Sequence, residues 1–111
     1  MKKILFFCLE GVSRSPTAAR VFNEMLHNDG LSGEYHASYA GILSEDKPGC
    51  KEVEESFRVI AVDGMVANAL CKTYPDAKTK LRQLSVPDIY ERDCPELVGI
   101  FKEYYVSKEW L

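Results

Sequence analysis

A cysteine and an arginine enclose the most informative stretch of this sequence. Cys8 and Arg14 stand at the ends of the segment Cys-Leu-Glu-Gly-Val-Ser-Arg, which Ser15 and Pro16 follow. The largely apolar residues 3–7 are typical of a buried strand, and Pro16 suits the first position of a helix. A loop between a strand and a helix can direct backbone N–H groups and the helix dipole at an oxyanion. We therefore expect a tetrahedral oxyanion site with a thiol at its floor and a guanidinium at its rim.

These residue types suit nucleophilic attack on phosphorus. The thiolate is the reactive form of cysteine, and helix N-termini and nearby cations favour it. Cys8 would attack, Arg14 would hold two phosphate oxygens in a bidentate fork, and Ser15 would donate its hydroxyl to the sulfur. The residues between the cysteine and the arginine would bind the phosphate as the substrate-binding loop. They are Leu9, Glu10, Gly11, Val12 and Ser13.

The composition indicates one ordinary globular domain, which we place over residues 1–111. Of the 111 residues, 46% are apolar and 28% are charged. The net charge of −3 and the lack of a basic stripe argue against nucleic acid as a partner. No apolar run approaches the roughly 18 residues of a membrane span, so no membrane partner is expected, and the run after Lys3 is too short for a signal peptide.

The cysteines carry information about cofactors and location. They stand at positions 8, 50, 71 and 94, with neither a CxxC motif nor paired metal-ligand spacing. We therefore expect no metal, no cofactor and a reduced, cytoplasmic protein.

The hydrophobic pattern predicts strands that alternate with helices. Apolar segments predict strands at residues 3–7, 35–40, 58–62 and 80–84. Amphipathic segments predict a helix at 17–27, a short one after residue 49, one that runs to Pro75, and a terminal one. Their expected inward residues are Ala18, Val21, Phe22, Met25 and Leu26; Cys50, Val53 and Phe57; Val66, Ala69, Leu70 and Tyr74; and Leu97, Ile100, Phe101 and Tyr104.

Such alternation favours a three-layer α/β fold. We predict a four-stranded parallel sheet with helices on both faces, in the flavodoxin-like strand order 2-1-3-4. The loop after the first strand would then lie at the topological switch point, where sheets of this kind bind ligands. Loops after the neighbouring strands would reach the same place.

Two segments together resemble the low-molecular-weight protein tyrosine phosphatases, in particular their short bacterial branch. Residues 8–16 follow the pattern Cys-x5-Arg-Ser-Pro directly after a strand, and residues 86–90 resemble the family's general-acid loop, with Ile89 in place of a proline. The resemblance implies a phosphatase that hydrolyses either phosphotyrosine in a protein or a small aryl phosphate. The reaction would pass through a phosphocysteine. It also implies that Asp88 is the general acid and that Tyr90 is a platform for the substrate.

Asp93 is the alternative to Asp88 as the acid, because both precede the last predicted helix. Residues 93–96, Asp-Cys-Pro-Glu, also resemble a capping box, in which Asp93 would begin that helix and leave Asp88 as the acid.

Three positions depart from the family's pattern. Glu10 and Gly11 stand where the resemblance puts glycine and asparagine, and Ser13 stands where it puts a second cysteine. An asparagine would brace the loop, whereas Gly11 offers only a left-handed backbone. Glu10 would repel a phosphate dianion or pair with Arg14. Without a cysteine at position 13, reversible disulfide protection of Cys8 is impossible.

These departures keep two other functions open. The chain would then be a catalytically weak or inactive phosphate-binding or interaction protein on the same fold, or a phosphocarrier. The phosphocarrier reading rests on a resemblance to the B components of cellobiose-type sugar phosphotransferase systems, which Cys8, Gly11 and Ser15 would fit. Arg14 and the loop of Asp88 would not be expected in such a carrier.

Overall fold

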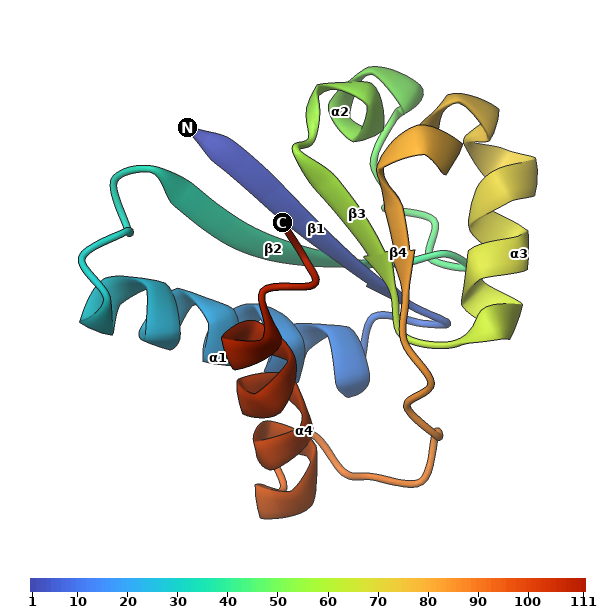
Figure 1. Cartoon of the computed structure of the whole chain (residues 1–111). Helices are drawn as coiled ribbons and strands as arrows, with labels where there is room; N and C mark the ends of the chain where they lie inside the picture. The colour runs from blue at the N-terminus through green and yellow to red at the C-terminus, as the bar shows by residue number, and fades with distance from the viewer.

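Four parallel strands form the centre of the computed structural model, which describes all residues from 1 to 111. They are β1 (Lys2–Cys8), β2 (Tyr35–Gly41), β3 (Arg58–Ala61) and β4 (Leu81–Gln83). Their order is β2-β1-β3-β4, and every neighbouring pair is parallel (Figure 1). The predicted fold class and strand order are therefore confirmed.

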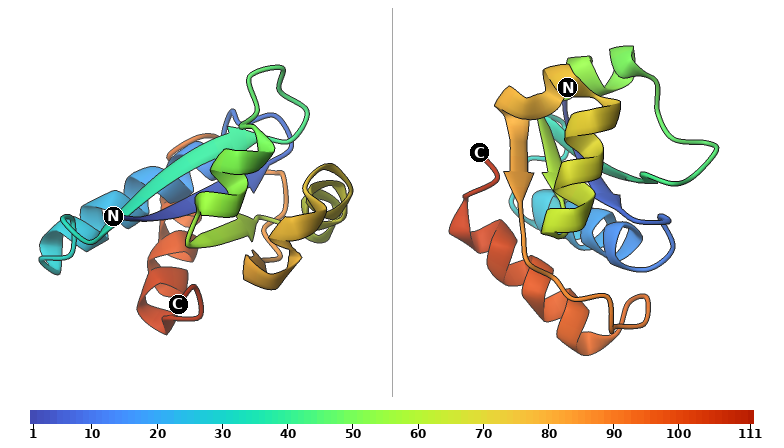
Figure 2. Two further views of the ribbon diagram at one scale, coloured as in Figure 1. Left: turned by 90° about the horizontal axis from the view of Figure 1, so that it is seen from above. Right: turned by 90° about the vertical axis from the view of Figure 1, so that its right-hand side faces the viewer.

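Helices cover both faces of this sheet (Figures 1 and 2). On one face lie α1 (Arg14–Asn28) and α4 (Pro95–Ser107). On the other lie α2 (Cys50–Glu55), α3 (Gly64–Thr73) and a 3₁₀ helix, η1 (Pro75–Lys80). None of the helices has the length and apolar character that crossing a membrane requires.

The central position of β1 follows from its apolar residues, which are buried on both faces. Residues 4–8 are each less than 4% exposed. Phe6 packs edge-to-face on Phe22 of α1, with ring centroids 4.8 Å apart, and Phe7 contacts Tyr74 on the other face at 5.8 Å. A parallel strand that is apolar throughout belongs in this position. The strand that ends in the cysteine is thus held from both sides.

Helix α1 begins three residues earlier than predicted. It starts at Arg14 instead of Thr17, because the carbonyl of Ser13 accepts the N–H of Thr17 at 3.2 Å and closes the first turn. Pro16 is therefore the third residue of the helix and not the first. Its missing N–H costs nothing there, since the first N–H groups of a helix have no partner inside it. Arg14 is consequently held by regular helical backbone.

Some of the predicted inward positions are wrong or only marginal. Cys50 is exposed, because it is the first residue of the short helix α2. Ala69 and Ile100 are only partly buried, and Ala67 and Tyr105 are buried in their helices instead. The buried faces of α3 and α4 are thus shifted slightly from the predicted apolar faces. The spacing of apolar residues does not fix the buried face of a helix to within one residue.

The carboxyl end of β2 packs closely against the loop that follows β1. The pairing of β1 with β2 continues past the strands, because Ile42 N–H donates to Cys8 O at 3.0 Å and Leu43 N–H donates to Leu9 O at 2.9 Å. A Cβ atom on Gly41 would lie 2.3 Å from the carbonyl carbon of Glu10. Glycine is therefore required at position 41.

We predict that Gly41→Ala destabilises the fold by roughly 1–3 kcal/mol or more, because the added methyl group overlaps backbone atoms that cannot swing away. Gly33→Ala is the matched control, since a Cβ at Gly33 meets nothing within 4 Å. Urea unfolding of the three proteins measures the difference. Equal stability of the Gly41→Ala and Gly33→Ala proteins would contradict the close packing.

Candidate active site

Cys8 is the last residue of β1 and lies at the bottom of the loop, residues 9–13, that leads into α1. Two hydrogen-bond donors approach its buried sulfur. The backbone N–H of Gly11 donates to Cys8 Sγ at 3.1 Å, and Ser15 Oγ lies 3.0 Å from the same atom. Both contacts stabilise a negative charge on the sulfur, which is what a nucleophilic thiolate needs.

Ser15 can form a hydrogen bond with Cys8 in both its thiol and its thiolate form. Its Oγ also lies 3.3 Å from the carbonyl oxygen of Ala40, and the residue is fully buried. A hydroxyl group carries a single proton but can also accept. While Cys8 is a thiol, its S–H donates to Ser15 and Ser15 donates to Ala40. When the thiolate forms, the proton of Ser15 turns to the sulfur.

Gly11 braces the loop by close backbone contact. It has a φ of 75°, the left-handed conformation that glycine adopts without strain. A Cβ atom there would lie 2.9 Å from the backbone nitrogen of Gly41. An asparagine at this position would therefore have to displace the end of β2. In this chain close backbone packing against Gly41 holds the loop, where the family pattern has an asparagine side chain.

The sulfur opens into a small cavity of about 140 Å³, a size that suits a tetrahedral anion. Its lining joins the loop after β1 with the loop after β4. The lining residues are Cys8, Leu9, Glu10, Val12, Ser13, Arg14 and Asp88. The structure thus brings together seven of the ten residues predicted for the site, and Gly11 and Ser15 contact the sulfur from behind this lining.

The guanidinium of Arg14 makes its two hydrogen bonds through a single nitrogen, Nη1. Its side chain is 3% exposed, and its Nη1 donates to Asp63 Oδ2 at 2.6 Å and to the carbonyl oxygen of Val86 at 2.8 Å. Nε lies 3.5 Å from Asp88 Oδ1, and Nη2 makes no hydrogen bond. The Asp88 carboxylate therefore approaches the edge formed by Nε and Nη2, which is the edge that a bidentate anion would take. The alternative ion pair between Arg14 and Glu10 does not form.

Asp63 is the site residue that the sequence analysis missed. It lies two residues after the end of β3, which is the neighbour of β1 in the sheet. Its Oδ1 accepts the N–H of Val66 at 2.8 Å and caps α3, while its Oδ2 holds Arg14. Partial burial raises the pKa of Asp63, but the N–H of Val66 and the guanidinium of Arg14 outweigh it, so the pKa lies below its ordinary value.

Asp88 and Asp93 have different surroundings. The side chain of Asp88 is 62% exposed at the mouth of the cavity, within reach of Arg14. Asp93 accepts a hydrogen bond from Arg20 Nε at 2.9 Å, which holds the pKa of Asp93 below its ordinary value despite opposing desolvation. Its backbone N–H donates to Thr17 Oγ1 at 2.8 Å. Hydrogen bonds to two residues of α1 thus hold Asp93 against the side of that helix.

The predicted capping role of Asp93 is wrong. Helix α4 begins at Pro95 with Cys94 as the N-cap residue, and no side chain caps it. Asp93 has a left-handed φ of 61°, so the chain turns there before the helix can start. Its contacts with α1 anchor the end of the loop that carries Asp88.

Tyr90 does not line the cavity. Its ring is partly buried against the apolar core, and its role as a substrate platform stays a prediction. No group of three or more histidine, cysteine or acidic side chains is arranged to hold a metal ion.

We predict that Asp63→Asn destabilises the protein by roughly 1–3 kcal/mol at neutral pH, because asparagine keeps the helix cap but leaves Arg14 with a weaker, uncharged acceptor. The folded state lowers the pKa of Asp63 from 3.8, so this stabilisation is complete above about pH 4. It is lost as the pH falls through the lowered value. Urea unfolding at pH 7 and near pH 2.5 should show a larger and then a smaller difference from wild type; a difference that does not change with pH would contradict the charge pairing.

Comparison with known protein families agrees with this geometry. The family model described as low molecular weight phosphotyrosine protein phosphatase matches residues 3–80, which is more than half of the chain. The comparison with curated proteins found no match.

Several solved structures share the fold. YfkJ from Bacillus subtilis has a TM-score of 0.82 and 20% identity, over 96% of this chain and 91% of that chain. A protein tyrosine phosphatase from Entamoeba histolytica has a TM-score of 0.77 and 18% identity, over 95% and 90%. The YwlE arginine phosphatase from Geobacillus stearothermophilus has a TM-score of 0.67 and 17% identity, over 96% and 87%. With the family match, we conclude that the chain belongs to the low molecular weight phosphotyrosine protein phosphatases, a family of hydrolases.

Proposed function

We propose that the protein is a cysteine-dependent phosphatase that hydrolyses phosphotyrosine or another aryl phosphate through a phosphocysteine. One observation carries this proposal: a nucleophile, an anion clamp and an acid line the same small cavity. Cys8, Arg14 and Asp88 supply these three functions. Cys8 and Arg14 stand at the two ends of one loop, whereas Asp88 comes from the distant loop after β4, so only the fold brings Asp88 to the other two.

In the first step, the sulfur of Cys8 would attack phosphorus while the bond from phosphorus to the aryl oxygen breaks. The free edge of Arg14 and the N–H groups of the loop would stabilise the charge on the three equatorial oxygens. Asp88, protonated at this stage, would give its proton to the leaving oxygen. Its exposed position at the mouth is where a leaving group would depart.

In the second step, water would attack the phosphocysteine. Asp88, now a carboxylate, would take a proton from that water, and the sulfur would leave as a thiolate. Gly11 and Ser15 would receive it again with their N–H and O–H donors. Inorganic phosphate is then released, and no external reactant besides water is needed.

Apolar groups at the mouth support an aryl leaving group. Val12, in the cavity lining, is 61% exposed, and Ile89, next to Asp88 in the chain, is 76% exposed. Large apolar side chains in such positions suit packing against an aromatic ring. One structural neighbour is an arginine phosphatase. Phosphoarginine should therefore be tested as a competing substrate beside the aryl phosphates.

We predict that Cys8→Ser abolishes turnover but keeps phosphate binding, because the loop N–H groups and Arg14 are untouched. Hydrolysis of p-nitrophenyl phosphate and calorimetric titration with phosphate measure the two properties. Cys50→Ser, on the exposed side of α2, is the matched control and should behave as wild type. Residual hydrolysis above about a tenth of wild type would exclude Cys8 as the nucleophile, since losing a nucleophile costs far more.

We predict that Asp88→Asn lowers kcat by roughly 10²–10⁴ for phenols that are poor leaving groups, the usual contribution of a general acid. The loss should shrink for acidic phenols, which leave without a proton. Steady-state kinetics over a series of substituted phenyl phosphates measures this dependence. Asp93→Asn is the comparison: if that substitution produces the leaving-group dependence, Asp93 is the acid.

A further inference from the structure

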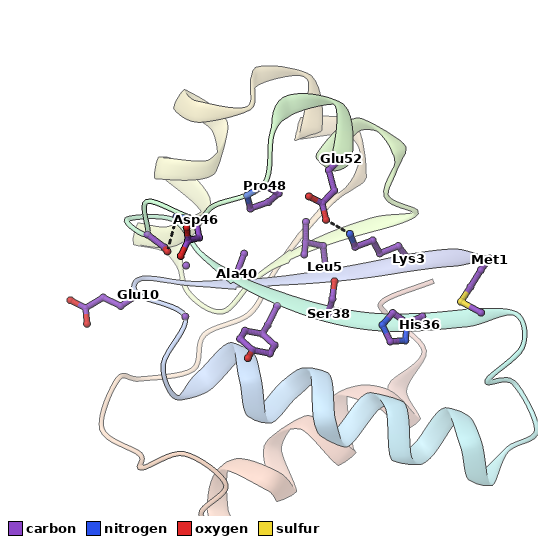
Figure 3. A pocket seen from close by; sticks show the side chains of 14 residues that line it. Met1, Lys3, Leu5, Glu10, His36, Ser38, Ala40, Asp46, Pro48 and Glu52 are labelled. Carbon is purple, nitrogen blue, oxygen red and sulfur yellow. Dashed lines mark hydrogen bonds and ion pairs between the residues drawn. The ribbon is translucent and has the colours of Figure 1, made fainter.

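A second and larger cavity lies beside the phosphate loop (Figure 3). Its volume is about 600 Å³, and it runs from the loop along β1 and β2, below α2. Glu10 lines both this cavity and the small one that holds Cys8. A substrate that binds in the small cavity can therefore pass over Glu10 into the larger one, which we call the β2 groove.

The floor of the β2 groove is built by strand alternation. His36, Ser38 and Ala40 stand at alternate positions of β2 and so share one face, and Lys3 and Leu5 do the same on β1. Figure 3 shows these side chains along the groove between the sheet and Glu52 of α2. The floor is preformed by the sheet and does not depend on a mobile loop.

The polar groups of the β2 groove are partly without partners. Glu52 pairs with Lys3, but no cation pairs with Glu10 or Asp46. Two unpaired carboxylates thus lie along the groove, and a cation would pair with them.

We propose that the β2 groove binds a lysine or arginine side chain of a phosphorylated protein, next to the residue whose phosphate enters the small cavity. This inference rests on the proposed phosphatase function. The charge of Glu10 repels a free phosphate dianion but attracts a cation on the same substrate. The groove therefore selects basic phosphopeptides over small aryl phosphates. Glu10 and Asp46 form the ion pairs.

The test compares p-nitrophenyl phosphate with two phosphotyrosine peptides that differ only in flanking lysines or glutamates. Wild type should favour the lysine peptide in kcat/KM, and the preference should fall with added salt. In the Glu10→Gln, Asp46→Asn double variant, the preference should fall by about five- to twentyfold, since an exposed ion pair is worth at most a factor of about five. Glu10→Gln alone should lower KM for p-nitrophenyl phosphate more than for the lysine peptide, because only the peptide loses an ion pair.

Glu103→Gln is the matched control, because it removes one exposed, unpaired carboxylate from α4 on the opposite face of the sheet. If it reduces the peptide preference as much as the double variant does, the proposal is overturned. A Glu10→Gln effect of the same size on both substrates would also overturn it. Peptide binding to the Cys8→Ser protein, measured by calorimetry, tests the groove without turnover. A lysine preference there, with no hydrolysis of any aryl phosphate by wild type, would overturn only the phosphatase function.

Discussion

The buried guanidinium of Arg14 is the constraint on which the site depends. A cation that is 3% exposed must be paired, or it would not stay in place. Asp63 and the carbonyl of Val86 occupy one of its nitrogens, and these groups come from the ends of β3 and β4. These two acceptors therefore offset the free-energy cost of burying the charge of Arg14. The remaining edge, formed by Nε and Nη2, is the one that a bidentate anion in the cavity shared with Cys8 would take.

The parallel sheet makes this convergence possible. Because all four strands point the same way, their carboxyl ends meet at one edge, and the segments after them place Cys8, Asp63 and Asp88 near Arg14. Close contacts then set the spacing. Gly41 lets the end of β2 touch the phosphate loop, and Thr17 links the loops through its hydroxyl, which donates to Ser13 O at 2.9 Å and accepts from Asp93 N–H. The pocket is rigid because backbone contacts hold it.

Much of this arrangement could be predicted from the sequence. The strands and the loop from Cys8 to Arg14 follow from hydrophobic runs and local spacing, which are short-range signals. The strand order was predicted from the winding that is common in parallel α/β sheets. Asp63 could not be assigned in that way, because an aspartate before a glycine also reads as an ordinary helix start, and its contact with Arg14 spans 49 positions. The capping box at Asp93 failed for the same reason: its local pattern was outweighed by contacts with α1. Local motifs pointed to the candidate residues, and tertiary contacts give each of the three carboxylates different surroundings.

Formation of a phosphocysteine is the central claim, and rapid-quench trapping tests it most directly. The protein is mixed with radiolabelled aryl phosphate, quenched in acid within one turnover, and mapped by peptide mass spectrometry. The account predicts a labelled phosphate on Cys8 that appears before the steady state and decays as fast as the enzyme turns over. Turnover without label on Cys8 would contradict the account. So would a label on Cys8 that persists without hydrolysis, which is the behaviour of a phosphocarrier.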